Sequence, residues 1–219
     1  MRPRVLRLAV KPAVFALALV PLGHLAWRAV QHRLGANPLE AVTHGTGDWA
    51  LRFLLLTLAL TPARALTGWN QIARFRRMLG LFAFFYASLH LLTYLWFDQF
   101  FSWPDILHDI PKRPFITAGF FAFVALVPLA ATSTAGMVRR LGGRRWQALH
   151  RLVYLAAVAA VVHYWWLVKA DLSSPRFYLL LLLGLLCARA GVALRRRAAK
   201  ATPPGSAGGG PRIFAPKSS

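Results

Sequence analysis

The sequence predicts an all-α, polytopic membrane protein, a bundle of about six transmembrane helices. Hydrophobic residues make up 57% of its 219 residues and charged residues only 15%. The apolar residues lie in long blocks, and a hydrocarbon core of about 30 Å needs about 20 helical residues to cross it. The predicted spans are residues 12–27, 49–66, 78–97, 115–138, 152–168 and 177–194.

These spans differ in regularity. The first is short but uncharged, and the third, fourth and fifth also contain no charged side chain. The second is interrupted by Arg52 and Arg64 and the sixth by Arg189, so whether these two cross completely is left open. Residues 198–219 are rich in Pro, Gly, Ala and Ser, a composition that cannot bury a core. We therefore expect one transmembrane domain, residues 1–197, and a disordered cytoplasmic tail.

The net charge of +21 comes from 27 Lys and Arg residues against 6 acids. Most basic residues lie before the first span and after the second, fourth and sixth spans. The other connections contain all six acids: Glu40, Asp48, Asp98, Asp105, Asp109 and Asp171. Because Lys and Arg favour the cytoplasmic side, this alternation predicts an even number of spans with both termini in the cytoplasm. It also explains the charge without nucleic-acid binding, which we exclude.

Several other classes of protein are disfavoured. The single cysteine, Cys187, permits no disulfide within the chain and no covalent CxxCH attachment of haem. The first apolar block is not followed by a small-x-small cleavage pattern, so we expect no cleaved signal peptide. The sequence contains neither a dinucleotide-binding glycine motif nor a phosphate-binding loop, so we expect no nucleotide-binding domain.

Two histidines lie inside predicted spans, where an ionisable side chain marks a functional site by default. His90 lies eight residues before Asp98, and His163 lies six residues before Lys169. At 1.5 Å per residue these positions are about 12 and about 9 Å from the outer ends of two helices that run in the same direction. Two imidazoles at similar depth can be the axial ligands of one b-type haem. We predict that a haem lies between them and carries electrons.

His150 lies 13 residues before His163, close to Arg144, Arg145 and Arg151 at the cytoplasmic end. The two histidines do not share one ideal helical face, unless the regular helix begins after His150. A cytoplasmic surface role is the alternative to ligation. Together with His150, the basic residues at this end can form an electron-accepting site for an anionic donor: Arg74, Arg76, Arg77, Arg144 and Arg145.

Arg28 and Arg52 lie near the outer ends of the first two spans. Each can extend its guanidinium to the lipid headgroups or pair with a haem propionate. We favour the headgroups for Arg28 and leave both options open for Arg52. The remaining histidines have weaker signals. His24 is in the first span, and three are expected on outer-loop surfaces: His32, His44 and His108.

Four ordered stretches contain these residues: NPLEAVTHGTGDWALRFLLLTLALTPAR from Asn37, RRMLGLFAFFYASLHLLTYLWFDQ from Arg76, KRPFITAGFFAFVALVPLAATS from Lys112 and RRWQALHRLVYLAAVAAVVHYWWLVKAD from Arg144. In these stretches the chain resembles the ferric reductase-type transmembrane domain and, more narrowly, the MsrQ family. The resemblance covers most of residues 8–197.

This resemblance implies a bacterial inner-membrane subunit that forms a heterodimer with a periplasmic molybdopterin enzyme, which reduces methionine sulfoxide in damaged proteins. It implies haem b and FMN as cofactors and electrons from the respiratory quinone pool. It also implies that His90 and His163 are haem ligands and that His150 is a further ligand.

One departure from the wider superfamily concerns the inner site. Members with two haems have two histidines on each of two helices, 13 or 14 residues apart. Counting back from His90 gives Arg77 or Arg76, so His150 has no histidine partner. A haem ligated on one side, or an FMN or quinone site lined by these arginines, remain the alternatives.

Two rival functions remain at this stage. One is a ferric-chelate-type reductase domain that works with a separate flavin reductase. The other is a proton or metal transporter that uses His90 and His163. Transporters usually need carboxylates inside the membrane, and we expect none of the six acids to lie within a span.

Overall fold

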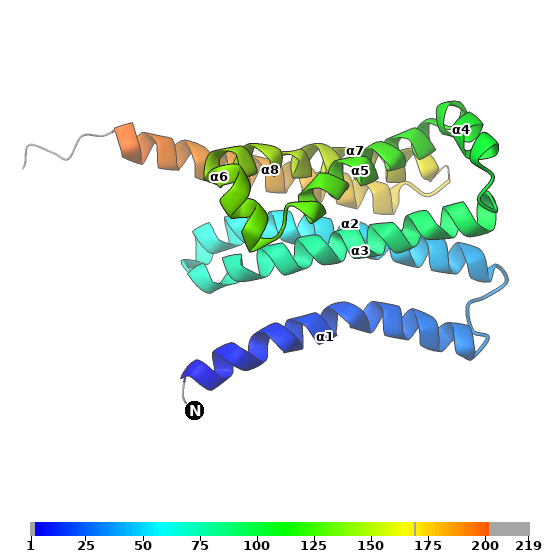
Figure 1. The fold of residues 1–219 in the computed structure, drawn as a ribbon, viewed down its shortest axis with the longest axis horizontal. Coiled ribbons are helices and arrows are strands. Elements are labelled where there is room, and N and C mark those ends of the chain that lie inside the picture. The colour runs from blue at the N-terminus through cyan, green and yellow to red at the C-terminus, as the bar shows by residue number, and fades with distance from the viewer. Residues whose placement is uncertain (1–2, 169, 202–219) are drawn as a thin grey trace, which may run out of the picture.

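The computed structural model describes residues 3–168 and 170–201. Within them the chain is helical and contains no strand, as the sequence predicts (Figure 1). The elements, in order, are α1 (Pro3–Val30), α2 (Pro38–Thr67), the 3₁₀ helix η1 (Asn70–Phe75), α3 (Arg76–Thr93), the π-helical turn η2 (Tyr94–Asp98), α4 (Trp103–Lys112), α5 (Pro114–Ala131), α6 (Ala135–Leu149), α7 (Leu152–Leu167) and α8 (Ser173–Ala201).

Five helical segments of the described chain are long and apolar enough to cross a membrane. These are Val10–Val30, Pro38–Thr67, Asn70–Asp98, Pro114–Ala131 and Ser173–Arg195. Helices α6 and α7 meet at a bend of 42° and together qualify as a sixth. The polytopic helical fold is therefore confirmed. The second and sixth spans, which the sequence left open, have the required length.

Two of the three arginines that interrupt these spans, Arg52 and Arg189, bind residues of other helices. The Arg52 Nε donates to the hydroxyl of Tyr178 at 2.9 Å, which joins α2 to α8. The Arg189 Nε donates to the hydroxyl of Tyr154 at 3.0 Å, and its Nη1 donates to the Leu58 carbonyl at 2.8 Å. Hydrogen bonds of this kind offset the cost of taking a polar group out of water. Both helices can therefore carry an arginine without being interrupted.

Helix α2 begins well before the predicted start of the second span. The Asn37 side chain accepts from the Glu40 amide at 3.2 Å, and Pro38 occupies the first turn. A side-chain cap followed by proline is a strong helix start. As a result, Glu40 and Asp48 lie inside α2, so the expectation that no acid lies within a span is wrong.

The sequence predicted that the fourth span ends at residue 138, but α5 ends at Ala131. The Thr132 hydroxyl donates to the Pro128 carbonyl at 2.6 Å, and the Ser133 hydroxyl donates to the Leu129 carbonyl at 2.7 Å. The Thr132 amide also donates to the Pro128 carbonyl at 3.0 Å, whereas the Ser133 amide donates to the Ala130 carbonyl and leaves that of Leu129 to the Ser133 hydroxyl. The chain then turns into the basic helix α6, which the sequence analysis did not predict. It also missed the short helix α4.

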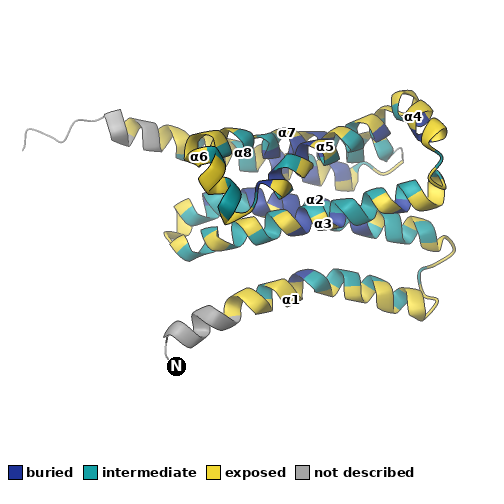
Figure 2. Ribbon diagram, in the orientation of Figure 1, coloured by how far each residue is buried: buried dark blue, intermediate teal, exposed yellow. Residues whose placement is uncertain are grey.

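The helices pack as two close pairs, α2 with α3 and α5 with α7, and α8 lies against α2 and α7. Most buried side chains lie in these four paired helices (Figure 2). In α7, Ala156 and Ala157 are fully buried, since small residues let membrane helices approach closely. Helix α1 is largely exposed, and the buried hydroxyl of Tyr86 holds it by accepting from the Leu22 amide and donating to the Ala18 carbonyl.

The start of α1 and the end of α8 lie at the same end of the bundle (Figure 1). We call this the α6 end, because α6 and the turn η1 are also there. The opposite end contains α4 and the α1–α2 and α7–α8 connections, and we call it the α4 end. The predicted tail begins at residue 198, whereas α8 continues to Ala201. Residues 202–219 lie outside the described part of the chain.

Topology reporters test how this bundle is oriented. The alternation of charge predicts that the α6 end is cytoplasmic, so a cytoplasmic reporter fused after Gly143 or Lys200 is active. A periplasmic reporter is active when it is fused between Ser102 and Ile110. A cytoplasmic signal from a reporter fused between Ser102 and Ile110 would contradict the predicted orientation.

Candidate functional site

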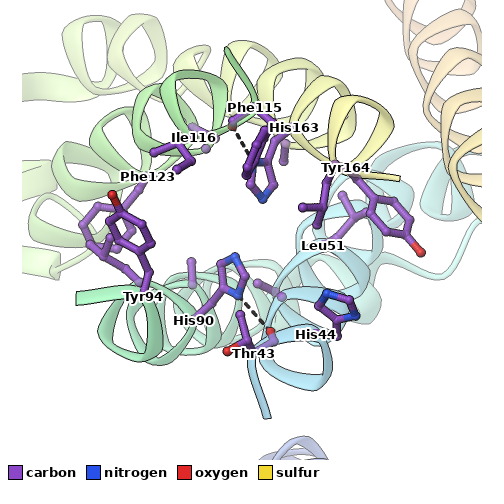
Figure 3. Close-up of a pocket in the computed structure, with 18 of the residues that line it drawn as sticks. Thr43, His44, Leu51, His90, Tyr94, Phe115, Ile116, Phe123, His163 and Tyr164 are labelled. Carbon is purple, nitrogen blue, oxygen red and sulfur yellow. Dashed lines mark hydrogen bonds between the residues drawn. The ribbon is translucent and has the colours of Figure 1, made fainter. Parts of the chain in front are cut away.

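A cavity of about 510 Å³ lies between α2, α3, α5 and α7 towards the α4 end (Figure 3). Its volume is in the range of pockets that hold cofactors. His90 projects into it from α3 and His163 from α7 (Figure 3). Both helices run from the α6 end to the α4 end (Figure 1), as the depth argument requires. The structure therefore brings together the two histidines that the sequence analysis paired.

Each imidazole is held by a backbone carbonyl of the neighbouring helix. The His90 Nδ1 is 2.9 Å from the Thr43 carbonyl oxygen, and the His163 Nδ1 is 2.6 Å from that of Phe115. A carbonyl can only accept, so Nδ1 carries the proton in both rings. The lone pair of each Nε2 is then free for a metal. Histidines that bind metals are usually fixed by such a bond from the second nitrogen.

A glycine lies beside each ring, four residues after the carbonyl that holds it. A Cβ on Gly47 would be 3.0 Å from the His90 Nδ1, and one on Gly119 would be 2.9 Å from the His163 Nδ1. The two helix pairs thus repeat one arrangement, a carbonyl and a glycine one turn apart on one helix and an imidazole on its partner. Neither glycine was predicted from the sequence, although small residues in membrane helices allow close helix approach.

The distance between the rings fits one metal ion between them. Their centroids are 5.9 Å apart and their planes are inclined at 73°. With metal–nitrogen bonds of about 2 Å, and each ring centre about 1 Å behind its nitrogen, collinear imidazoles have centroids about 6 Å apart. The residues present therefore fit axial ligation from two sides.

The polarity of the cavity changes along its length. The lining residues farther from the α4 end are apolar: Ala50, Leu51, Leu54, Ala87, Phe123, Leu126 and Ala160. The charged and amide-bearing ones lie near the α4 end: Asn37, Glu40, His44, Asp48, Asp98 and Arg113. The cavity therefore suits a flat apolar group with anionic substituents on one edge. The apolar part of the group would contact the apolar residues, and its anionic edge would lie at the polar end.

Other predicted residues lie elsewhere. Arg52 is not among the residues that line the cavity, and it pairs with Asp48 at 3.1 Å. The Arg28 side chain donates to the Arg33 carbonyl just beyond the end of α1. His44 was expected in a loop, but it lies in α2 and lines the cavity (Figure 3). The other three surface or span histidines are exposed: His24, His32 and His108.

His150 lies at the other end of the bundle and does not line this cavity. It follows α6, and α7 begins at Leu152, so the regular helix starts after it. The His150 Nε2 is 3.2 Å from the Thr132 hydroxyl, and its ring stacks on Trp146 with centroids 3.9 Å apart. The half-buried Arg76 is within electrostatic range. The other basic residues predicted at this end are exposed: Arg74, Arg77, Arg144 and Arg145.

The fold and the site define a class of protein: a polytopic helical membrane protein in which four helices enclose two facing imidazoles. Comparison with known families agrees with this class. Residues 46–161 match the family described as the ferric reductase like transmembrane component. This match runs from within α2 into α7 and includes His90, and it ends two residues before His163.

Individual relatives narrow the family. The chain is 55% identical to a protein of Herminiimonas arsenicoxydans over 182 residues, which cover 82% of this chain and 84% of the relative. It is 57% identical to one of Rhodospirillum rubrum over 183 residues, which cover 84% and 88%. Both are named protein-methionine-sulfoxide reductase heme-binding subunit MsrQ. The chain belongs to the MsrQ family within the ferric reductase-like transmembrane proteins.

The glycine beside His163 can be tested without any cofactor. We expect Gly119→Ala to push the ring from the Phe115 carbonyl and to lower the free energy of unfolding in detergent by about 1 kcal/mol or more. Gly184→Ala on α8 is the matched control, because nothing lies within 4 Å of a Cβ there. Alanine favours a helix over glycine by about 0.5–1 kcal/mol, so the control should be neutral or slightly stabilising. Equal stability of the two variants would show that Gly119 is not needed for clearance.

Proposed function

We propose that this chain binds haem b between His90 and His163 and carries electrons through the membrane. The observation that carries the proposal is the pair of facing imidazoles, each fixed through Nδ1 to a backbone carbonyl. The relatives support it, since they are named as haem-binding subunits. When bound, haem supplies reversible one-electron chemistry at its iron.

The residues of the chain have three tasks in this proposal. His90 and His163 would be the ligands of the haem iron, and their carbonyl partners fix the two rings in place. The hydrogen bonds from Nδ1 also increase the basicity of the coordinating nitrogens. The apolar lining, including Leu51, Leu54 and Leu126, keeps water from the macrocycle. Solvent exclusion and ligand basicity are both means of setting a redox potential.

The acceptor in the proposal is a periplasmic, molybdopterin-dependent protein-methionine-sulfoxide reductase that repairs oxidised periplasmic proteins. Two points support it. The relatives are named after a protein-methionine-sulfoxide reductase. The cavity lies towards the α4 end, which the charge pattern predicts to be periplasmic. A haem there would be close to a soluble acceptor.

The donor in the proposal is a membrane quinol or a separate flavin reductase, acting at the α6 end. His150 and Arg76 lie there, and cationic side chains favour an anionic donor or the phosphate of FMN. FMN enters only through the family resemblance. We place it at this end because the basic residues gather there.

The rival functions differ in what they require. A ferric-chelate reductase would use the same haem with another acceptor, and the names of the relatives favour methionine sulfoxide reduction over it. A transporter would use an ionisable group inside the membrane. Asp48, which lies inside α2, is a group of this kind, but its carboxylate already forms an ion pair with Arg52.

Replacing either histidine tests the haem site. We expect His90→Ala and His163→Ala each to abolish the low-spin spectrum of the purified protein, because the iron loses one of two axial nitrogens. His24→Ala is the control, since His24 is exposed on α1. It should retain the wild-type spectrum.

Cells that produce these variants extend the test to the acceptor. We expect oxidised methionine to accumulate in periplasmic proteins with His90→Ala and His163→Ala but not with His24→Ala. A full low-spin spectrum in either cavity variant would refute the axial pair. A lost spectrum with normal repair would refute the proposed acceptor only.

A further inference from the structure

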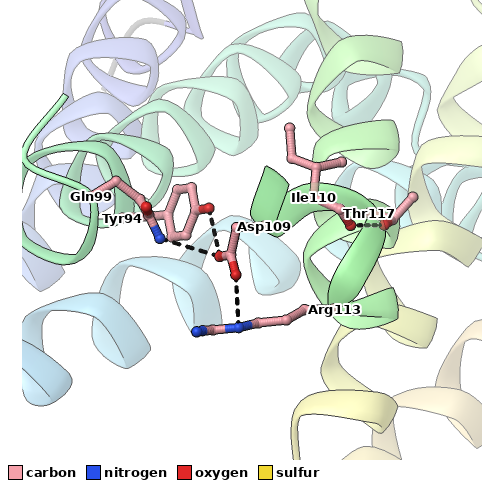
Figure 4. Close-up of polar contacts among 6 residues, drawn as sticks. All are labelled: Tyr94, Gln99, Asp109, Ile110, Arg113 and Thr117. Carbon is pink, nitrogen blue, oxygen red and sulfur yellow. Dashed lines mark hydrogen bonds and ion pairs between the residues drawn. The ribbon is translucent and has the colours of Figure 1, made fainter. Parts of the chain in front are cut away.

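Arg113 stands at the junction of α4 and α5 and lines the histidine cavity. Its Nε donates to the Asp109 Oδ1 at 2.8 Å (Figure 4). No hydrogen bond joins its two Nη groups to another residue of the described chain, and the side chain is 56% exposed. A guanidinium has five donors in a fixed fork. The larger part of this fork is therefore available to a ligand.

Asp109 holds Arg113 in place. Asp109 is only 9% exposed, although it lies in a short helix outside the spans. Its Oδ2 accepts from the Tyr94 hydroxyl at 2.9 Å and from the Gln99 side chain at 3.2 Å (Figure 4). Both carboxylate oxygens are thus engaged, and the network ties the end of α3 to the start of α5. This support fixes Arg113 beside the cavity.

The charges around the cavity single out Arg113. Among the described lining residues, it is the one Lys or Arg. The acids at the same end have partners of their own in two cases, since Asp48 pairs with Arg52 and Glu40 accepts from Asn37. The third, Asp98, is exposed. An anionic group at this end of the cavity would therefore meet one guanidinium that is held in place and has free donors.

Haem has two propionate carboxylates on one edge of an otherwise apolar ring. The apolar part of the cavity offers a carboxylate no partner, and burying it there would be costly. Guanidinium and carboxylate form strong, charge-assisted bonds. We propose that Arg113 binds a haem propionate and that Asp109 positions it. The inference rests on the proposed haem site, and it gives Arg113 the role that the sequence analysis considered for Arg52.

The competing account is that Arg113 only neutralises the buried Asp109. The two accounts differ in how Arg113 responds to the ligand. We would reconstitute the full-length, haem-free protein with haemin and with haemin dimethyl ester, in which both carboxylates are blocked. The wild-type protein should bind haemin about tenfold or more tightly than it binds the dimethyl ester, because a hydrogen bond to a charged group contributes about 1.5–3 kcal/mol.

We expect Arg113→Gln to remove this preference, whereas Lys112→Gln should retain it. Lys112 is the matched control, because it is the neighbouring cation but does not line the cavity. If Arg113 has a purely structural role, Arg113→Gln weakens the binding of both porphyrins equally and keeps the preference for haemin. That result would overturn the inference. If Arg113→Gln fails to fold, Arg113→Lys decides. Loss of the fork should reduce the preference, and an unchanged preference would refute the proposal.

The same titration separates this inference from the function on which it rests. If the wild-type protein gives no low-spin spectrum with either porphyrin, the haem site itself is wrong, and the role of Arg113 falls with it. If it binds both porphyrins with a low-spin spectrum but does not discriminate between them, only the role of Arg113 is wrong.

Discussion

The structure depends on the hydrogen bond from each cavity imidazole to a backbone carbonyl of the adjacent helix. Two free imidazoles would rotate, and in a bilayer their polar nitrogens would lack partners. The bonds to Thr43 and Phe115 require α3 to lie close to α2 and α7 close to α5. That proximity requires Gly47 and Gly119 and explains why these two pairs are the most tightly packed. The orientation of the two imidazoles and the packing of the helices are thus set by the same contacts.

Arginine has different roles at different depths of the bundle. Arg52 and Arg189 lie inside spans and are bound by tyrosines of other helices, so they join helices together. Arg113 lies at the cavity mouth and keeps donors free. A positive charge inside a membrane protein therefore has to be interpreted from its partners and not from its depth alone. On this basis the partner that we propose for the anionic edge of the cofactor is Arg113 at the α4–α5 junction and not Arg52 in α2.

The sequence predicted the spans and the facing histidines, because hydropathy and helix rise determine both with little tertiary information. It could not predict the end of α5. Hydropathy continues without a charge to residue 138, but the side-chain hydrogen bonds of Thr132 and Ser133 accompany the end of the helix at Ala131. His44 was placed in a loop because its segment is polar, although Asn37 and Pro38 start a helix before it. Likewise, the partners of Arg52 and the carbonyls behind the imidazoles come from helices distant in sequence.

The central claim is that two fixed, steeply inclined imidazoles hold one haem iron. Low-temperature EPR of the oxidised, full-length protein tests it most directly. With ring planes at 73°, the iron d orbitals that interact with the two rings remain close in energy. The account therefore predicts a low-spin ferric signal of strong anisotropy. High-spin iron alone, or the rhombic low-spin spectrum of parallel imidazoles, would contradict it.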